Sequence, residues 1–194
     1  IGKRHLRLVR ESLPEANIWV LRRSACDVVP EFANGCFDSL AEACAFAPQA
    51  SVVASPAPFH VDTAIALIAA GSHVLVEKPL ALTAKDARKI LVIASHHQRL
   101  LQIGYNLRFL ESLEKFGELI QSRIIGNVLS VRSEVGQYLP TWRPETDYRH
   151  GVSAQKNLGG GVLLELSHEI DYLQWIFGRV DWVSAWTGQQ SSLD

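Results

Sequence analysis

Short apolar segments that do not alternate with polar residues, separated by helical patterns, constrain the fold more than any other feature of this sequence. Four such segments are expected to be buried strands, and they lie at residues 17–22, 51–55, 73–77 and 100–104. Helical patterns precede or separate them over residues 3–12, 39–46, 59–70 and 83–96. Thr83, followed three residues later by Asp86, resembles a capping box at the start of the last helix. Strands that are apolar on both faces are typical of a parallel sheet covered by helices. Residues 1–104 are therefore predicted to form a doubly wound α/β domain.

The pattern changes after residue 104, and a second domain of the α+β class is predicted for residues 105–194. Residues 128–138 and 180–187 alternate in the manner of antiparallel strands. Helices are expected over about 109–121 and about 161–177. So few elements cannot close a hydrophobic core by themselves. The segment is therefore interpreted as part of a domain with an open antiparallel sheet.

The composition excludes several classes of function. The chain has 194 residues, with 19 Lys and Arg against 20 Asp and Glu and a net charge of −1. A nucleic-acid or polybasic membrane surface needs a net basic face, so neither partner is expected. The uncharged run over residues 43–61 contains prolines that would break a membrane-spanning helix. The three cysteines form no C-x-x-C pair, so neither a disulfide framework nor a metal site is expected, and the cytoplasm is the predicted location.

Lys78 is the first candidate for a chemical role, because its motif Glu77-Lys78-Pro79 directly follows the apolar strand His73–Val76. In an open parallel sheet, ligands bind at the carboxyl ends of the strands. Pro79 restricts the backbone of Lys78 to an extended conformation and can itself follow a cis bond. A lysine placed in this way can act as an acid/base group. The alternative is a solvated lysine at a strand end, which would be the preferred interpretation if the motif stood alone.

Further motifs accompany it, and their order and spacing resemble a known family. They are Ser55-Pro56-x-x-Phe59-His60, Ala70-Gly71-x-His73 leading into Glu77-Lys78-Pro79-Leu80, Gly104-Tyr105-Asn106-x-Arg108-Phe109, and Gly159-Gly160-Gly161 leading into Glu165, His168 and Asp171. In this arrangement the chain resembles the glucose–fructose oxidoreductase, inositol dehydrogenase and rhizopine-catabolism (Gfo/Idh/MocA) family from residue 1 to about residue 177.

The resemblance implies an NAD(P)-dependent oxidoreductase with a Rossmann domain followed by a C-terminal substrate domain. It implies that the protein forms homo-oligomers, either dimers or tetramers, and acts on a small sugar-like molecule. It also implies several contacts with the cofactor, by Ser55, Pro56, His60, Glu77 and Lys78. Contacts with substrate are implied for Lys78, Tyr105, Arg108 and Asp171.

The resemblance also predicts a chain that is truncated at both ends. Family members open with a strand and a G-x-G-x-x-G turn, in which the glycines let the pyrophosphate approach a helix N-terminus. Here Gly2 matches the third glycine of that turn, and the first strand and the first two glycines would precede Ile1. Gly2 is thus expected to contact the cofactor, although dinucleotide binding by the fragment is expected to be poor.

The position of Arg22, Arg23 and Ser24 bears on the choice of cofactor. The group that contacts the 2′ position of the adenosine ribose lies about 20 residues beyond the glycine turn. An acidic residue there prefers NAD, whereas guanidinium and hydroxyl groups suit the 2′-phosphate of NADP. NADP is therefore favoured over NAD. The alternative is that both arginines face solvent.

His168 is predicted to be the acid/base group that exchanges a proton with the substrate hydroxyl, by its match to the family motif. Glu165 and Asp171 lie three residues to either side of it, so one helix would bring the three side chains near one face. The family usually places Asp four residues before this histidine. Glu165 is predicted to be a catalytic residue together with Lys78 and His168. Its three-residue spacing from His168 departs from the family pattern, so its exact role stays open.

A loop that mixes aromatic residues with arginines precedes this helix. Aromatic rings stack on sugar faces and arginines bind carboxylates or phosphates, so Trp142, Arg143 and Tyr148 are candidate substrate contacts. An ordinary surface loop is an equally good interpretation. The leading hypothesis is a sugar, cyclitol or sugar-acid dehydrogenase, and the rival is a non-catalytic dinucleotide-sensing regulator on the same scaffold. The presence of both Lys78 and His168 favours the enzyme.

Overall fold

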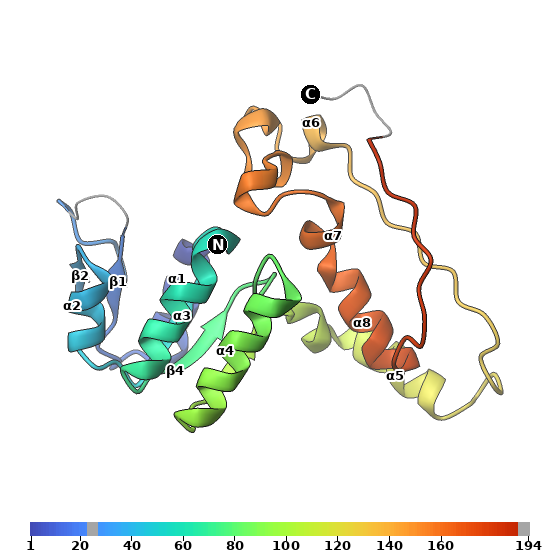
Figure 1. Ribbon diagram of the computed structural model, residues 1–194, viewed down its shortest axis with the longest axis horizontal. Coiled ribbons are helices and arrows are strands. Elements are labelled where there is room, and N and C mark those ends of the chain that lie inside the picture. The colour runs from blue at the N-terminus through green and yellow to red at the C-terminus, as the bar shows by residue number, and fades with distance from the viewer. Residues whose placement is uncertain (23–26, 190–194) are drawn as a thin grey trace. The chain divides into compact units, whose positions relative to one another are not determined.

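The computed structural model describes residues 1–22 and 27–189, and its backbone divides into two units, residues 1–104 and 105–194 (Figure 1). In the first unit the helices are α1 (Gly2–Ser12), α2 (Leu40–Ala45), α3 (His60–Ala69) and α4 (Ala84–His96), with a short 3-10 turn η1 (Ala57–Phe59). Its strands are β1 (Trp19–Leu21), β2 (Gly35–Phe37), β3 (Ala50–Val53), β4 (His73–Val76) and β5 (Leu101–Ile103). The alternation of strands and helices is the one that the sequence predicts.

All strand pairs of the first unit are parallel, which confirms the doubly wound class. β1 pairs with β2, and β3, β4 and β5 form a second sheet in that order. In the order 3-2-1-4-5-6 of a complete doubly wound sheet, the strand that precedes the glycine turn lies between the second and fourth strands. Among the described residues no strand joins β1 to β3, so the two sheets are separate.

The core of the first unit lies between the β3-β4-β5 sheet and the two helices that connect its strands. α3 packs against β4 and against α4 (Figure 1). The side chains of Ile68, Val76 and Ile90 are completely buried there. This apolar contact holds the carboxyl edge of the sheet, from which the candidate site residues project, on a rigid support.

A second apolar cluster joins β1 and β2 to the end of α2. The rings of Trp19 and Phe37 stack with centroids 4.8 Å apart, and Phe46 packs against both. Gly35 lies directly under Trp19, where a Cβ atom would come within 2.6 Å of the indole. Cys36 of β2 is disulfide-bonded whereas Cys44 keeps a free thiol. The sequence predicts no disulfide framework, but Cys36 is not the reduced thiol that the predicted cytoplasmic location implies, because residue spacing alone does not show which thiols the fold brings together.

The second unit is mainly helical in the structure. Its α-helices are α5 (Glu111–Gln121), α6 (Leu139–Trp142), α7 (Val162–Glu165) and α8 (Ser167–Phe177). Four short 3-10 turns accompany them: η2 (Asn106–Phe109), η3 (Tyr148–His150), η4 (Val152–Ala154) and η5 (Lys156–Leu158). α5 and η2 both pack against α8. Gly117 of α5 faces Ile176 of α8, where an added Cβ would lie 3.6 Å from the isoleucine.

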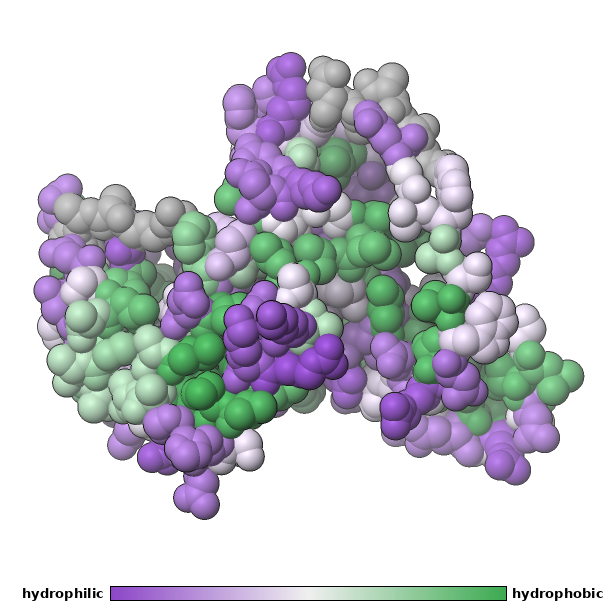
Figure 2. All heavy atoms as spheres, viewed as in Figure 1, coloured by the Kyte–Doolittle hydropathy of each residue, from purple (hydrophilic) through white to green (hydrophobic). Residues whose placement is uncertain are grey.

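Two expected strands of the second unit, residues 128–138 and 180–187, form no ladder with any described residue. A strand needs a partner for its backbone groups, and alternation along one segment does not supply one. Leu129 is 95% exposed and Trp182 is 80% exposed. Figure 2 shows hydrophobic atoms at the surface of this unit near the end of α5. The prediction of strands at these two places is therefore wrong for the described structure.

The long helix expected over about 161–177 is divided. Leu166, with φ −98° and ψ 24°, separates α7 from α8, and Gly161 precedes α7 with a positive φ of 105°. Glu165 thus ends one helix while His168 and Asp171 belong to the next. No described helix is long and apolar enough to cross a membrane.

Candidate active site

Lys78 lies two residues after Val76, the last residue of β4, at the carboxyl edge of the β3-β4-β5 sheet, as the sequence predicts. The bond between Lys78 and Pro79 is cis. The N–H of Glu77 donates to the carbonyl of Val53 at the end of β3, and the N–H of Gly104 donates to the carbonyl of Val76. The last ladder bonds therefore fix the chain up to the residue before Lys78.

Glu77 is held by a residue for which the sequence predicts no role. His5 Nε2 lies 2.6 Å from Glu77 Oε1, and the backbone N–H of Lys78 donates to Glu77 Oε2 at 3.3 Å. Gly104 lies on the other side of the carboxylate, where a Cβ atom would come within 3.1 Å of it. The close approach of Glu77 thus explains the glycine after β5. The acidic residue before Lys78 is tied to α1 and pressed against the end of β5.

His60 is buried at the start of α3, with 1% of its surface exposed. Nδ1 lies 2.8 Å from the carbonyl oxygen of Pro79, and Nε2 lies 2.7 Å from the carbonyl oxygen of Ser55. Both polar atoms of the ring are therefore occupied by the protein backbone. The hydroxyl of Ser55 is different, since Oγ is buried and has no hydrogen-bond partner among the described residues. Pro56 precedes η1 and begins the turn that leads to His60.

Arg22 directly follows β1 and lines a cavity of about 530 Å³ together with α1. Three further cations of the cavity come from α1, namely Lys3, Arg4 and Arg7. The cavity is also lined by the carboxylate of Glu31 and by the apolar side chains of Val28, Val29, Pro30 and Phe32. Four cations against one carboxylate, together with apolar side chains, suit a ligand that combines a flat ring with an anionic group. Arg23 and Ser24, the other two residues predicted for this place, lie outside the described residues.

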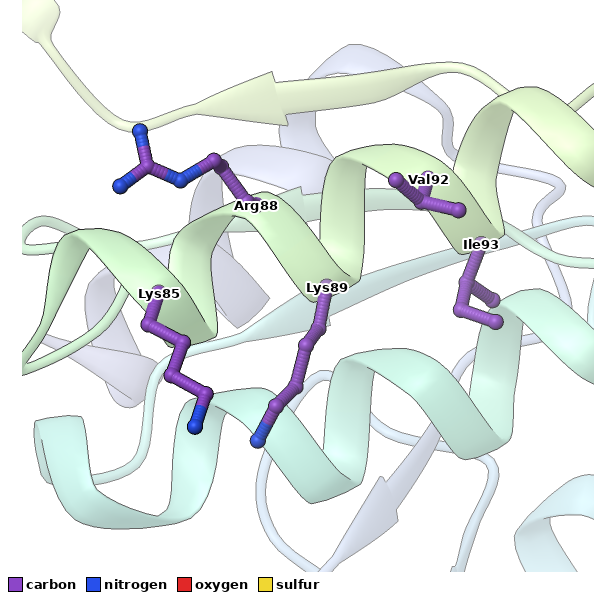
Figure 3. Close-up of a pocket in the computed structure, with 5 residues that line it drawn as sticks. All are labelled: Lys85, Arg88, Lys89, Val92 and Ile93. Carbon is purple, nitrogen blue, oxygen red and sulfur yellow. The ribbon is translucent and has the colours of Figure 1, made fainter.

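A different cavity lies on α4, and Figure 3 shows the five side chains that line it. Lys85, Arg88, Lys89, Val92 and Ile93 all belong to that helix. None of them is a predicted site residue. Lys89 is paired with Asp86 at 2.7 Å. We assign the cavity no role in the site.

In the second unit, η2 and α8 bring four of the predicted residues together. The rings of Tyr105 and His168 meet edge to face with centroids 5.6 Å apart. Arg108 binds Asp171 through two hydrogen bonds of 2.7 and 2.8 Å, and its guanidinium lies 5.8 Å from the ring centroid of Trp175. The hydrogen bonds to Asp171 raise the pKa of Arg108. Arg108 and Asp171 therefore neutralise each other beside the histidine.

Glu165 makes its described hydrogen bond with Ser153, whose hydroxyl donates to Oε2 at 2.9 Å. Its carboxylate thus joins α7 to the preceding η4 turn. In the loop before it, the guanidinium of Arg143 lies over the Trp142 ring at 5.3 Å, and Tyr148 begins η3. The ring contact described for the Trp142 and Arg143 side chains is with each other.

Comparison with known proteins decides the family. Residues 1–105 match the Gfo/Idh/MocA oxidoreductase family model for the NAD-binding Rossmann fold, and residues 113–193 match the model of the family's C-terminal domain. The chain belongs to the Gfo/Idh/MocA family.

Individual members of the Gfo/Idh/MocA family agree with this assignment. The chain is 32% identical over 129 residues to the rhizopine catabolism protein MocA of Rhizobium meliloti, an alignment that covers 66% of this chain and 38% of MocA. It is 32% identical over 133 residues to 1,5-anhydro-D-fructose reductase of Ensifer adhaerens, covering 66% of this chain and 37% of the reductase. The chain thus spans well under half the length of these relatives.

The fold agrees with solved structures of related proteins. The crystal structure of myo-inositol 2-dehydrogenase from Lactobacillus plantarum superimposes with a TM-score of 0.74 at 18% identity, covering 90% of this chain and 52% of that one. This likeness extends over both units and supports the fold of each.

The residues present fit the dinucleotide of a Gfo/Idh/MocA protein in two respects. Gly2 begins α1, whose first turn contains no acidic residue, so the helix N-terminus is open to an anionic group. An added Cβ at Gly2 would have Ala54 as its nearest neighbour, at 4.0 Å. The basic cavity at Arg22 lies along the same helix. Among the described residues, no group of three His, Cys, Asp or Glu side chains could hold a metal ion.

Sequence reasoning missed His5 and Trp175. His5 lies about one helical turn beyond Gly2, on the same side of α1. This spacing from the glycine is the sequence signal that could have identified His5 as a residue near the site. Its partner Glu77 is 72 residues away, and only the fold shows that contact. The position of Trp175 four residues after Asp171 on the same helix places it on the same face.

Proposed function

We propose that the complete protein is an NAD(P)-dependent oxidoreductase. It transfers hydride between the nicotinamide and a hydroxyl or keto carbon of a sugar, a cyclitol or a sugar-derived acid. The observation that carries the proposal is Lys78 at the carboxyl end of β4 in a member of an NAD-binding oxidoreductase family. Relatives named for 1,5-anhydro-D-fructose reduction and levoglucosan dehydrogenation support a sugar-like substrate.

Lys78 and His168 manage the proton of the substrate hydroxyl in this proposal. When bound, the dinucleotide supplies the hydride acceptor or donor. Lys78 donates to the substrate oxygen and stabilises the charge that develops on it. His168 exchanges the proton, and Tyr105 packs against the edge of its ring and restricts its orientation. Glu165 supports this segment through Ser153.

NADP is the proposed cofactor. Arg22 lies at the end of β1, where the 2′ position of the ribose is contacted in this fold, and the cavity beside it contains three further cations from α1. Gly2, Ser55, Pro56 and Glu77 contribute the remaining contacts at the strand ends. The hydroxyl of Ser55 suits such a contact because it is buried and has no partner among the described residues.

The substrate contacts proposed in the second unit are Tyr105, Arg108, Trp142, Arg143, Tyr148 and Asp171. The paired aromatic and guanidinium groups of Trp142 and Arg143 suit the face of a sugar ring that bears a carboxylate or phosphate. We propose that the complete protein acts as a homo-oligomer, a dimer or a tetramer, in the cytoplasm.

Replacement of Lys78 tests the proposed function. In the complete protein, Lys78→Ala is expected to lower kcat by roughly 10²–10⁴-fold, the usual contribution of a positioned acid/base group. Cofactor affinity should barely change. Lys85→Ala, which removes an exposed lysine of α4, is the matched control and should retain full turnover. Turnover near the wild-type rate in Lys78→Ala would contradict the role. Dinucleotide binding without hydride transfer to any polyol would favour a regulator.

A further inference from the structure

His60 connects the two loops that emerge from neighbouring strands at the candidate site. Ser55 follows β3 and Pro79 follows β4, and the carbonyl oxygens of both lie within 2.8 Å of the two ring nitrogens of His60. The side chain is 1% exposed, and its contact with Pro79 is buried whereas its contact with Ser55 is partly buried. Water is therefore kept from the contact with Pro79. His60 itself begins α3, which packs on β4 through the buried core. The ring therefore links a rigid helix to these loops through one or both of its nitrogens.

The chemistry of the ring makes this a hydrogen-bonded connection. Both partners are carbonyl oxygens, which only accept, so the imidazole must be the donor. A neutral ring donates from one nitrogen and an imidazolium donates from both. In either form, at least one of the two carbonyl groups, that of Pro79 or that of Ser55, accepts a hydrogen bond from the ring.

The contact with Pro79 has a direct consequence for Lys78, because the two residues are adjacent. On the other side of Lys78, Glu77 is bound to His5 at 2.6 Å and is pressed against Gly104. The backbone of Lys78 is therefore fixed at the residue before it and at the residue after it. Without the second fixed point, the loop after β4 could shift while the strand itself stayed in place.

We propose that His60 is a positioning residue that sets the place of Lys78 through its hydrogen bond to the carbonyl of Pro79. This inference rests on the proposed function for its catalytic part. It replaces the expectation that His60 contacts the cofactor, because both ring nitrogens face the protein's own backbone. A displacement of about 1 Å at a reacting group can lower a rate by roughly 10²-fold.

Three substitutions in the complete protein separate the two hydrogen bonds from simple packing. His60→Asn places its amide nitrogen near the position of Nδ1 and can donate to Pro79. His60→Gln reaches the position of Nε2 and can donate to Ser55. His60→Leu fills a similar volume and has no donor. His96→Gln, on the exposed end of α4, is the control for the loss of a histidine.

The first measurement is backbone hydrogen exchange of residues 77–82, which does not depend on catalysis. His60→Leu and His60→Gln are expected to speed exchange there about tenfold or more, with amides in the core of α3 and α4 unchanged. His60→Asn should remain close to wild type. If exchange ranks by side-chain volume, so that Gln is closest to wild type, or if exchange at 77–82 does not change, the proposal is wrong. If His60→Leu does not fold, the Asn and Gln variants decide the question.

The second measurement is the split between kcat and KM. His60→Leu and His60→Gln should lower kcat about 10- to 100-fold and leave the KM for the cofactor nearly unchanged. An increase in the cofactor KM at unchanged kcat would assign His60 to cofactor binding and overturn the proposal. Loss of the proposed function is recognised separately, by full activity in Lys78→Ala. In that case the exchange contrast between the Asn and Gln variants still tests the link between His60 and the Pro79 loop.

Discussion

Two carboxylates of the candidate site are bound to partners within their own unit. Glu77 binds His5, and Asp171 binds Arg108 through two hydrogen bonds. A charge that is held in this way keeps a fixed direction and loses less conformational entropy when a ligand arrives. If the proposed substrate contacts are right, the pair Arg108–Asp171 would act on a substrate as one dipolar group.

Breaking the pair should have a modest effect on stability. Arg108→Ala leaves the carboxylate of Asp171, whose side chain is 13% exposed, without its two donors. Because Arg108 itself is 43% exposed, solvent limits the loss to about 0.5–1.5 kcal/mol in the free energy of unfolding. Urea titration of the single variants and of the exchanged pair Arg108→Asp with Asp171→Arg measures the coupling. If the exchanged pair loses as much free energy of unfolding as the two single variants together, a direct interaction is contradicted.

The residues that could be predicted from the sequence are those whose neighbours along the chain explain them. Lys78 could be placed at the strand end because its motif directly follows a buried strand. Pro79 predicts an extended backbone at Lys78. The partner of Glu77 could not be predicted, because His5 reaches it across 72 residues. The same holds for His60, whose two acceptors depend on the alignment of β3 with β4.

At the level of elements, the capping signal at α4 is present as the sequence predicts. The hydroxyl of Thr83 accepts from the N–H of Asp86 at 3.1 Å and donates to the Asp86 carboxylate at 2.7 Å. Thr83→Ala is expected to lower the free energy of unfolding by about 1 kcal/mol, because an N–H of the first turn loses its acceptor. Thermal unfolding measures the change. Thr83→Ser keeps the hydroxyl and should remain near wild type, whereas equal losses in both variants would mean that the methyl group matters instead.

The turn η3 should respond to pH through Asp147. Hydrogen bonds from the side chain and backbone of Arg149 lower the pKa of Asp147 to about 2. Since the pKa of Asp147 is lowered in the folded chain, its contribution to stability is complete above the ordinary value of 3.8 and is lost as pH falls through about 2. Carbon NMR of the carboxyl group should show this low pKa. Arg149→Gln should raise it toward 3.8, and Arg143→Gln is the control that should not.

Elements that depend on distant partners were not predictable in the same way. Residues 128–138 alternate correctly for a strand, but alternation selects a face and does not select a partner. No proline or glycine stands at Leu166 to predict the break between α7 and α8. The break separates Glu165 from His168, although their three-residue spacing predicts that they share one helix face. α3 and α4, by contrast, contain both their periodic apolar face and their end signals, so local sequence sufficed.

At the scale of the whole molecule, the first unit shows how sheet order places a cofactor site. β1 and β3 belong to two separate sheets, and in the doubly wound order the strand before the glycine turn lies between the strands that correspond to them. Gly2 begins α1, which corresponds to the helix after the glycine turn, and Arg22 follows β1. The order of strands, and no single motif, therefore explains why the helix N-terminus and the basic cavity at Arg22 lie along the same helix. We propose that a dinucleotide contacts both places.

The basic cavity at Arg22 bears on the choice between NADP and NAD, and this choice is tested in the complete protein. If Arg22 and the cations of α1 bind a 2′-phosphate, the complete enzyme should bind NADPH more tightly than NADH. Arg22→Asp should narrow or reverse the difference, because one charge-assisted contact contributes roughly 1.5–3 kcal/mol, about ten- to a hundredfold in affinity. Arg88→Asp makes the same change of charge on the exposed face of α4 and should alter neither affinity. Isothermal titration of the unmutated protein and the two variants with NADPH and with NADH measures these affinities. Equal affinities in the unmutated protein, or a preference for NADH, would mean that Arg22 does not contact the ribose and that its cavity serves another anion.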